Sequence, residues 1–156
     1  MRKRLVTRTP ETVRSRREDW LDVERAAIVE ISSEQKDYPV EAAFVAGETL
    51  GWRAAEPGPQ TMRLIFDQPQ ELKRISLVFE EKETARTQEF VLRWSSDSGL
   101  LREIVRQQWN FSPPETICEV EEYQVELSNV TILELIIVPN TSGGSARASL
   151  KSLRVS

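Results

Sequence analysis

The sequence predicts an all-β fold, an eight-stranded antiparallel β-sandwich of the jelly-roll type that follows a short N-terminal helix or arm. After residue 23, short runs in which apolar and polar residues alternate are separated by turn residues. Alternation with a period of two buries one face of each sheet, and eight such runs match a jelly roll. At 156 residues the chain has the length of one domain. We therefore expect a basic arm over residues 1–22 and a single β-sandwich domain over residues 23–156.

The N-terminal segment is basic, with seven Arg and Lys against three Asp and Glu in residues 1–20 of a chain whose net charge is −4. Thr9, Pro10 and Glu11 are typical of a helix start, so a short helix is predicted over residues 10–20. A basic arm on an acidic body can contact nucleic acid or an acidic partner. The alternative is a solvated chain terminus.

The predicted strands follow one another at short intervals along the rest of the chain. The last but one is the most continuously apolar, as expected of a strand deep inside the sandwich. Before the second run lies a long connection, residues 39–60, which is rich in Gly, Pro and Ala. Loops of this length usually have a function or carry some structure, and we expect a helical turn over residues 40–44. The eight runs cover residues 26–32, 61–67, 72–80, 87–94, 101–111, 117–127, 130–138 and 146–155.

The composition argues against an enzyme. The chain has no histidine, which removes the commonest general base and the usual metal ligand. Its one cysteine, Cys118, allows no intramolecular disulfide and is expected in the core. No phosphate-binding glycine loop or metal-ligand cluster stands out, so we expect no cofactor and no metal. No apolar run approaches the roughly 18 residues of a membrane span. The basic N-terminus lacks the apolar region of a secretory signal, so we expect a cytoplasmic protein.

Short motifs resemble the galactose-binding-domain-like superfamily, whose best-known members are the discoidin (coagulation factor 5/8 C-type) domains. They are a turn at Ala43–Gly47, Trp52, an alternating strand at Gln60–Phe66 and a Pro-led turn into the next strand at Pro69–Leu77. The resemblance implies a β-sandwich whose loops at one end bind sugars, phospholipid headgroups, proteins or nucleic acid, mostly without catalysis. Fold alone does not fix which of these applies.

Many members of this superfamily also hold a structural calcium near the first long loop. They use an Asp before the turn glycine and an acidic residue in the last strand. Here the turn reads Val45-Ala46-Gly47 and the last strand carries Lys151 and Ser152. Because calcium needs several oxygen ligands, usually including carboxylates, no calcium site is expected.

The first candidate ligand-binding residues are Trp52 and Arg53 in the long connection. A loop Trp can stack on a sugar ring while a neighbouring Arg binds its hydroxyls. Asp37 and Tyr38, just before this connection, could join the rim of the site. The alternative is a Trp that plugs the end of the sandwich.

A second candidate pair, Arg86 and Gln88, extends the apolar face of the run that contains Phe90 and Leu92. An apolar face that becomes polar at one end indicates that this end leaves the core. Arg86 and Gln88 would then line a rim pocket, where Arg offers a fixed fork of donors. Alternatively, Arg86 pairs with an acidic neighbour such as Glu80 or Glu89.

The third candidates, Arg106 and Gln107, interrupt an apolar run that ends with Trp109 and Phe111. If the face that carries Trp109 is the inner one, Gln107 needs an internal partner and Arg106 points outward. These residues form either a cross-strand hydrogen-bond ladder or the floor of a binding site.

Together these observations favour a non-catalytic module that binds a carbohydrate-type or small polar ligand with loops at one end of the sandwich. The alternative is an intracellular interaction scaffold that contacts protein or nucleic acid. The basic arm favours the alternative. The acidic body disfavours nucleic acid, because phosphate contacts need a basic face.

Overall fold

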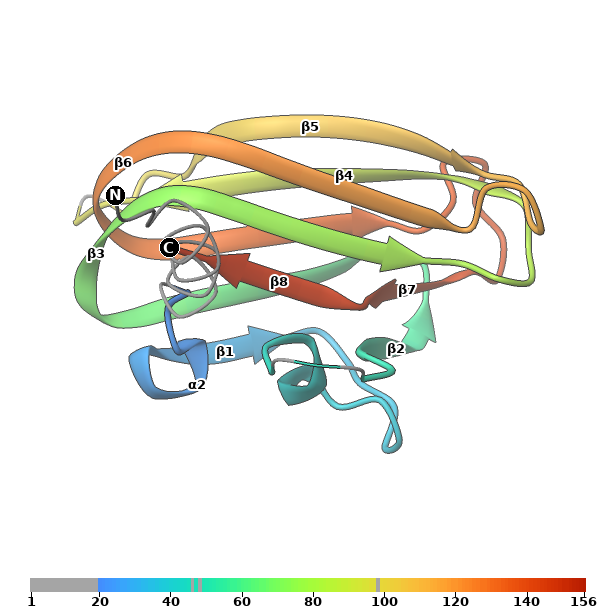
Figure 1. Ribbon diagram of the computed structural model, residues 1–156, viewed down its shortest axis with the longest axis horizontal. Helices are drawn as coiled ribbons and strands as arrows, with labels where there is room; N and C mark the ends of the chain where they lie inside the picture. The colour runs from blue at the N-terminus through green and yellow to red at the C-terminus, as the bar shows by residue number, and fades with distance from the viewer. Residues whose placement is uncertain (1–19, 46, 48, 98) are drawn as a thin grey trace, which may run out of the picture.

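A computed structural model describes residues 20–45, 47, 49–97 and 99–156. Almost all of the predicted helix over residues 10–20 and of the basic arm therefore lies outside the described residues. The described residues form one helical turn, one 3-10 turn and eight strands (Figure 1). These are α2 (Val23–Ala26), β1 (Ala27–Ile31), η1 (Val40–Ala43), β2 (Trp52–Pro57), β3 (Gln60–Glu80), β4 (Arg86–Ser95), β5 (Arg102–Phe111), β6 (Cys118–Val138), β7 (Arg147–Leu150) and β8 (Ser152–Val155).

Two long bent strands, β3 and β6, take part in both layers of the sandwich, and Figure 1 shows both curving back at the same end. The first half of β3 pairs with β1 and with the second half of β6, which continues through β4 to β5. The second half of β3 pairs with β8 and with the first half of β6. We call these the five-stranded and the three-stranded layer. A separate two-stranded sheet, β2 with β7, lies at the opposite end from the bends.

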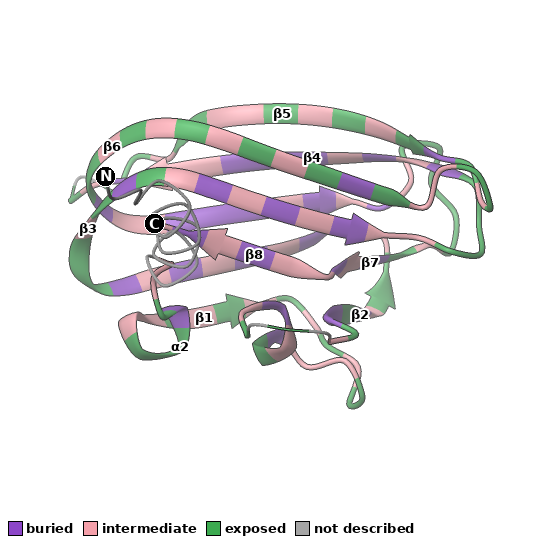
Figure 2. Ribbon diagram, viewed as in Figure 1, coloured by how far each residue is buried: buried purple, intermediate pink, exposed green. Residues whose placement is uncertain are grey.

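The core lies between the inner faces of the two layers. On β3, the predicted alternation is confirmed in both halves, with Met62, Leu64 and Phe66 buried in the first half. Figure 2 shows the same alternation along β4 and β6. The rings of Phe79 on β3 and Phe90 on β4 lie 5.2 Å apart between their centroids, a contact between the two layers.

The predicted all-β sandwich is confirmed, although the strands are not the eight predicted ones. The runs 61–67 and 72–80 form one strand, β3, and the runs 117–127 and 130–138 form one strand, β6. The run 146–155 instead divides into β7 and β8. The 3-10 turn over residues 40–43 matches the helical turn expected there. Cys118 is exposed at the start of β6, contrary to the prediction that it lies in the core.

Strand β2 lies within residues 39–60, for which the sequence predicts a connection. Gly51, just before β2, allows the backbone to approach β7 closely. Its φ is +73°, and a Cβ at this position would lie 2.4 Å from the Leu150 carbonyl oxygen. Only glycine fits both the left-handed conformation and this approach. The register that follows places Arg53 opposite Ser149.

Candidate functional site

A pocket of about 460 Å³ opens at the end of the sandwich where β2 and β7 lie, and we call it the loop-end pocket. One wall is the outer face of β2 and β7. The other walls are the β3–β4 loop (residues 81–85) and the β6–β7 loop (residues 139–146). The side chains that line it are mostly polar and include Gln35, Arg53, Glu83, Asn140, Arg147 and Ser149.

The β2–β7 wall presents two arginines around a serine. Arg53 lies opposite Ser149, and Arg147 precedes Ser149 by two residues, so strand alternation puts all three on one face. The burial pattern agrees, because Ala148 and Leu150 on the other face of β7 are buried. Arg147 donates from Nε to the Ala55 carbonyl oxygen at 3.1 Å, which fixes the direction of its guanidinium.

Arg53 is held by the segment before η1. Its Cζ lies 4.4 Å from the centroid of the Tyr38 ring, a cation–π contact. Its backbone N–H donates to the Tyr38 carbonyl, and its own carbonyl accepts from the N–H of Gln35. Tyr38 is half-buried and Asp37 is exposed beside it. The structure therefore brings Arg53 and Tyr38 into contact, but of the two only Arg53 lines the pocket. Asp37 does not line it and makes no side-chain hydrogen bond or ion pair with the described residues.

The two loops of the pocket are tied by one buried arginine. The Arg86 side chain is 1% exposed and donates from Nε to Glu81 at 2.7 Å. Its Nη1 donates to the Pro139 carbonyl oxygen at 2.7 Å and to Gln88 at 3.2 Å. Its Cζ also lies 4.8 Å from the centroid of the Phe111 ring.

Glu81 is the acceptor at the base of the β3–β4 loop. Its carboxylate also accepts the backbone N–H groups of Glu83 and Thr84. Burial alone would raise the pKa of Glu81, but the hydrogen bond from Arg86, the two backbone hydrogen bonds and the Arg86 charge together lower it. The loop is thus anchored by an ionised carboxylate.

The predicted residues Arg86 and Gln88 therefore lie beneath the pocket and do not line its surface. Both are buried. Gln88 accepts the hydrogen bond from Arg86 and donates in turn to Glu119 at 3.2 Å. The alternative, an Arg paired with an acidic neighbour, describes Arg86 correctly, although the partner is Glu81 and neither Glu80 nor Glu89. Both side chains support the loops from inside.

Trp52 is placed in the core. It is 1% exposed, and its indole Nε1 donates to the Ser33 carbonyl oxygen at 3.0 Å. No face of the ring is open to a sugar, so the predicted stacking role does not fit this position. The alternative, a Trp that plugs the end of the sandwich, describes it.

Arg106 and Gln107 lie on β5, the outermost strand of the five-stranded layer, and do not line the loop-end pocket. Arg106 is exposed and pairs with Glu103 at 3.0 Å and Glu89 at 3.6 Å. Gln107 shares the inner face with Trp109 and is half-buried. The outward direction predicted for Arg106 is observed. The cross-strand hydrogen-bond ladder is not, because the Gln107 side chain makes no hydrogen bond with the described residues and Arg106 donates to Glu103 on its own strand.

Sequence reasoning missed Arg147, Ser149 and Asn140, which also line the pocket. The signal for the first two was the alternation in 146-ARASL-150, which puts Arg147 and Ser149 on the polar face of the closing run. Their proximity to Arg53 depends on pairing between strands that are far apart in the sequence. No local pattern marks Asn140.

A buried acidic group lies on the inner face of β6. Glu119 is 0% exposed, and its Oε2 has no hydrogen-bond partner. Burial, and next the charge and hydrogen bond of Glu121, raise the pKa of Glu119 to about 8, against the hydrogen bond from Gln88 and the Arg86 charge. Tyr123 donates to Glu121 at 3.2 Å, and burial together with Glu121 raises the pKa of the phenol as well. This environment favours the protonated, neutral form of Glu119.

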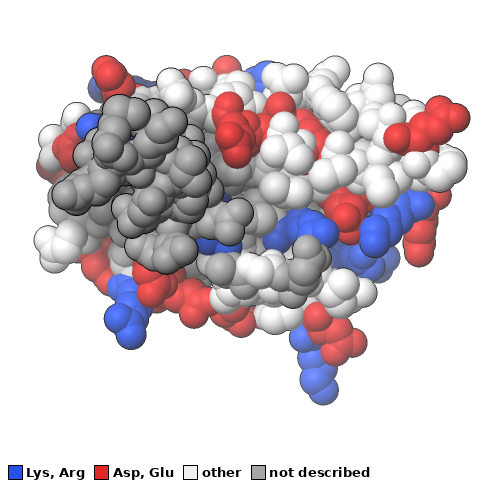
Figure 3. All heavy atoms as spheres, in the orientation of Figure 1, with Lys and Arg blue, Asp and Glu red and all other residues white. Residues whose placement is uncertain are grey.

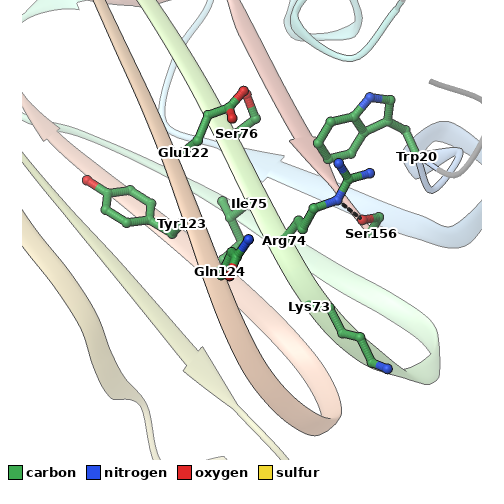
Figure 4. A pocket seen from close by; sticks show the side chains of 9 residues that line it. All are labelled: Trp20, Lys73, Arg74, Ile75, Ser76, Glu122, Tyr123, Gln124 and Ser156. Carbon is green, nitrogen blue, oxygen red and sulfur yellow. Dashed lines mark hydrogen bonds between the residues drawn. The ribbon is translucent and has the colours of Figure 1, made fainter. Parts of the chain in front are cut away.

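A larger pocket, of about 1010 Å³, lies against neighbouring parts of β3 and β6 beside Trp20 (Figure 4). Arg74 is its most prominent polar side chain. The Arg74 Cζ lies 4.2 Å from the centroid of the Trp20 ring, and Nε donates to Ser156 at 3.1 Å. The guanidinium is thus already held between two protein groups, so we place the candidate site at the loop end.

The turn near the first long loop does not fit a calcium ion. Its Val45 carbonyl oxygen accepts a hydrogen bond from the Arg154 guanidinium at 2.9 Å, which puts a positive charge where a cation would need oxygen ligands. In the part of the chain that the structure describes, no three His, Cys, Asp or Glu side chains gather as a metal site would require. No helix among the described residues is long and apolar enough to cross a membrane.

The chain shares its fold with solved carbohydrate-binding modules. A family 32 module from Clostridium perfringens, solved with GalNAc-β-1,3-galactose, is 18% identical with a TM-score of 0.59, over 88% of this chain and 99% of that one. A second family 32 module from C. perfringens, solved with galactose, is 12% identical with a TM-score of 0.58, over 87% and 96%. A chitosan-binding module from Paenibacillus is 16% identical with a TM-score of 0.54, over 87% and 98%.

These likenesses show that the chain has the β-sandwich fold that the resemblance implies. No sequence profile of a protein family matches the chain, and no curated protein matches it either.

Proposed function

We propose that this chain is a non-catalytic carbohydrate-binding module whose ligand enters the loop-end pocket. The observation that carries the proposal is the polar wall of β2 and β7 at the end of a sandwich fold shared with carbohydrate-binding modules. The exposed donors of Arg53 and Arg147 and the half-buried hydroxyl of Ser149 line it from two paired strands. Strands hold such groups more rigidly than loops do.

The chemistry of the pocket suits a hydroxyl-rich ligand. Arginine offers five N–H donors and no acceptor, while Ser149 and Asn140 can both donate and accept. Glu83 on the opposite loop supplies a carboxylate acceptor for sugar hydroxyls. Donors on one wall and acceptors on the other can bind neighbouring hydroxyl groups of one ring.

A binding role without catalysis agrees with the residues available. The sequence lacks histidine. Glu81, the most enclosed carboxylate that lines the pocket, is held by Arg86 and two backbone N–H groups, with its pKa lowered. An ionised carboxylate held in this way is poorly suited to donate a proton. The cytoplasmic location predicted from the N-terminus stays a prediction.

The test is a glycan array probed with the whole chain, the Ser149→Leu variant and the Ser128→Leu variant. Ser149→Leu removes a hydroxyl and fills space in the pocket. Ser128→Leu makes the same exchange at an exposed position in the bend of β6, at the other end of the sandwich. We expect at least one glycan to bind the unmodified chain and Ser128→Leu, and to be lost with Ser149→Leu.

An array without any hit, from protein shown to be folded by circular dichroism, would contradict the proposal. That result would favour the protein-interaction scaffold. A hit that survives Ser149→Leu would place carbohydrate binding outside the loop-end pocket.

A further inference from the structure

The charges around the loop-end pocket are unequally paired. Glu80 accepts a hydrogen bond from Lys151 at 3.2 Å and forms an ion pair with Lys82 at 3.6 Å, and Glu81 is paired with Arg86. Arg53 and Arg147, in contrast, have no carboxylate within ion-pair distance among the described residues. Both line the pocket, and both are exposed.

These two arginines line the same pocket from one sheet face. The β2–β7 register shifts between Arg53 and Pro57, the partner of Arg147, so the two long side chains reach the pocket from either side of an irregularity and can meet around one ligand group. Ser149 lies between them, opposite Arg53. Two neighbouring positive charges repel each other, and an anion bound between them is attracted to both.

The surroundings also orient the two guanidinium groups. Arg53 packs on the Tyr38 ring, and among the described residues its guanidinium donates no hydrogen bond to a protein acceptor. Arg147 uses Nε on the Ala55 carbonyl and keeps its terminal nitrogens for another acceptor. Both guanidinium groups are thus held in place by protein contacts while their terminal N–H groups can donate to a ligand. A planar fork of this kind matches a carboxylate in two hydrogen bonds.

We propose that the saccharide bound in the loop-end pocket is acidic, and that its carboxylate is held by Arg53 and Arg147 with Ser149 as a third donor. The inference rests on the proposed carbohydrate function and narrows it to sugars of the uronic acid class. Glu83 on the facing loop disfavours a second carboxylate there and is left to accept hydroxyl groups. Figure 3 shows basic side chains gathered over the β7 and β8 region of the view.

The test compares oligosaccharides of galacturonate, glucuronate and mannuronate with their carboxyl-reduced forms, in which a primary alcohol replaces each carboxylate. Sulfated galactose oligosaccharides form a separate arm. Hits from an array are then measured by titration calorimetry. We expect at least one uronate to bind, and its reduced form to bind at least about tenfold more weakly, since hydrogen bonds to charged groups are the strong ones.

The variants Arg53→Gln and Arg147→Gln test the residues. Each is expected to weaken uronate binding about tenfold and to change binding of the reduced form much less. Glu83→Gln is expected to tighten uronate binding, and added salt to weaken it. The matched control is Arg25→Gln, which removes one charge from α2 at the other end of the molecule, where the Arg25 side chain is 90% exposed. It is expected to leave binding unchanged.

The outcomes separate the two proposals. Equal binding of acidic and reduced forms, or full binding by both arginine variants, would overturn the acidic assignment and leave carbohydrate binding in place. Binding of sulfated sugars alone would overturn the carboxylate assignment. If no saccharide binds to the folded chain, acidic or neutral, the proposed function fails and this inference fails with it.

Discussion

Arg86 and Glu81 form a largely buried ion pair, with 2.7 Å between Nε and Oε1, beneath the loop-end pocket. The same guanidinium also holds the Pro139 carbonyl. Since Glu81 belongs to the β3–β4 loop and Pro139 to the β6–β7 loop, one side chain sets the spacing of both walls. Arg86 is thus a positioning residue for the pocket, although it lies outside its surface.

Arg86→Met should lower the free energy of unfolding by about 3–5 kcal/mol, because it leaves Glu81 enclosed without its partner charge. Denaturant unfolding followed by tryptophan fluorescence measures the loss. Arg86→Lys keeps the charge but loses the fork and should cost less. A loss below about 1 kcal/mol for Arg86→Met would show that the pair contributes little.

Trp52→Phe separates the two roles considered for this residue. The change removes the hydrogen bond to Ser33 and part of the ring, so we expect a loss of roughly 1–3 kcal/mol in stability. Binding of any glycan found on the array should be retained, because the ring is buried. Loss of binding by a folded variant with an unchanged circular dichroism spectrum would instead indicate that Trp52 contacts the ligand.

The raised pKa of Glu119, about 8, predicts a pH-dependent stability. Between about pH 5 and pH 8 the folded chain keeps a proton here that the unfolded chain has released. The free energy of unfolding should therefore fall as the pH rises through this interval, by at most about 1.4 kcal/mol per pH unit from this group, and level off above it.

Glu119→Gln should remove this contribution, since an amide is neutral throughout and still offers Gln88 an acceptor. Denaturant unfolding at pH 5, 7 and 9 measures the difference between the two proteins. The variant should gain stability relative to the unmodified chain as the pH rises. Parallel profiles would show that Glu119 ionises near its usual pKa.

Gly51→Ala should destabilise the β2–β7 sheet. A Cβ would lie 2.4 Å from a backbone oxygen of β7, and φ is +73°. The expected cost is roughly 1–3 kcal/mol for the conformation, with further loss from the contact. Thermal unfolding measures it, with Gly58→Ala as the control, since Gly58 also has a positive φ but has open space around it. Equal costs would show that the close approach is unimportant.

The sequence predicted those parts of the fold that depend on local alternation. Met62, Leu64 and Phe66 bury the face expected of them because a strand's two faces can be read from the strand itself. The continuity of β3 through residues 67–71 could not be predicted. Asp67 and Pro69 are typical of a turn, and here they lie at an exposed bend with register shifts around it.

The site was predicted only in part, for a related reason. Arg53 and Tyr38 lie close in the sequence, so one stretch indicated both. The other half of the wall, Arg147 and Ser149, reaches Arg53 through pairing that no local pattern records. Arg86 was found for its unusual place on an apolar face, but its burial depends on how two distant loops close over it.

The strands β3 and β6 have a consequence for how the domain comes apart. Each belongs to both layers through one uninterrupted length of chain, and the two pair with each other on either side of the bends. Neither layer can lose β3 and β6 while the other keeps them. Amide hydrogens at the centres of both layers should therefore exchange with solvent through one common opening event, which makes the sandwich a single cooperative unit.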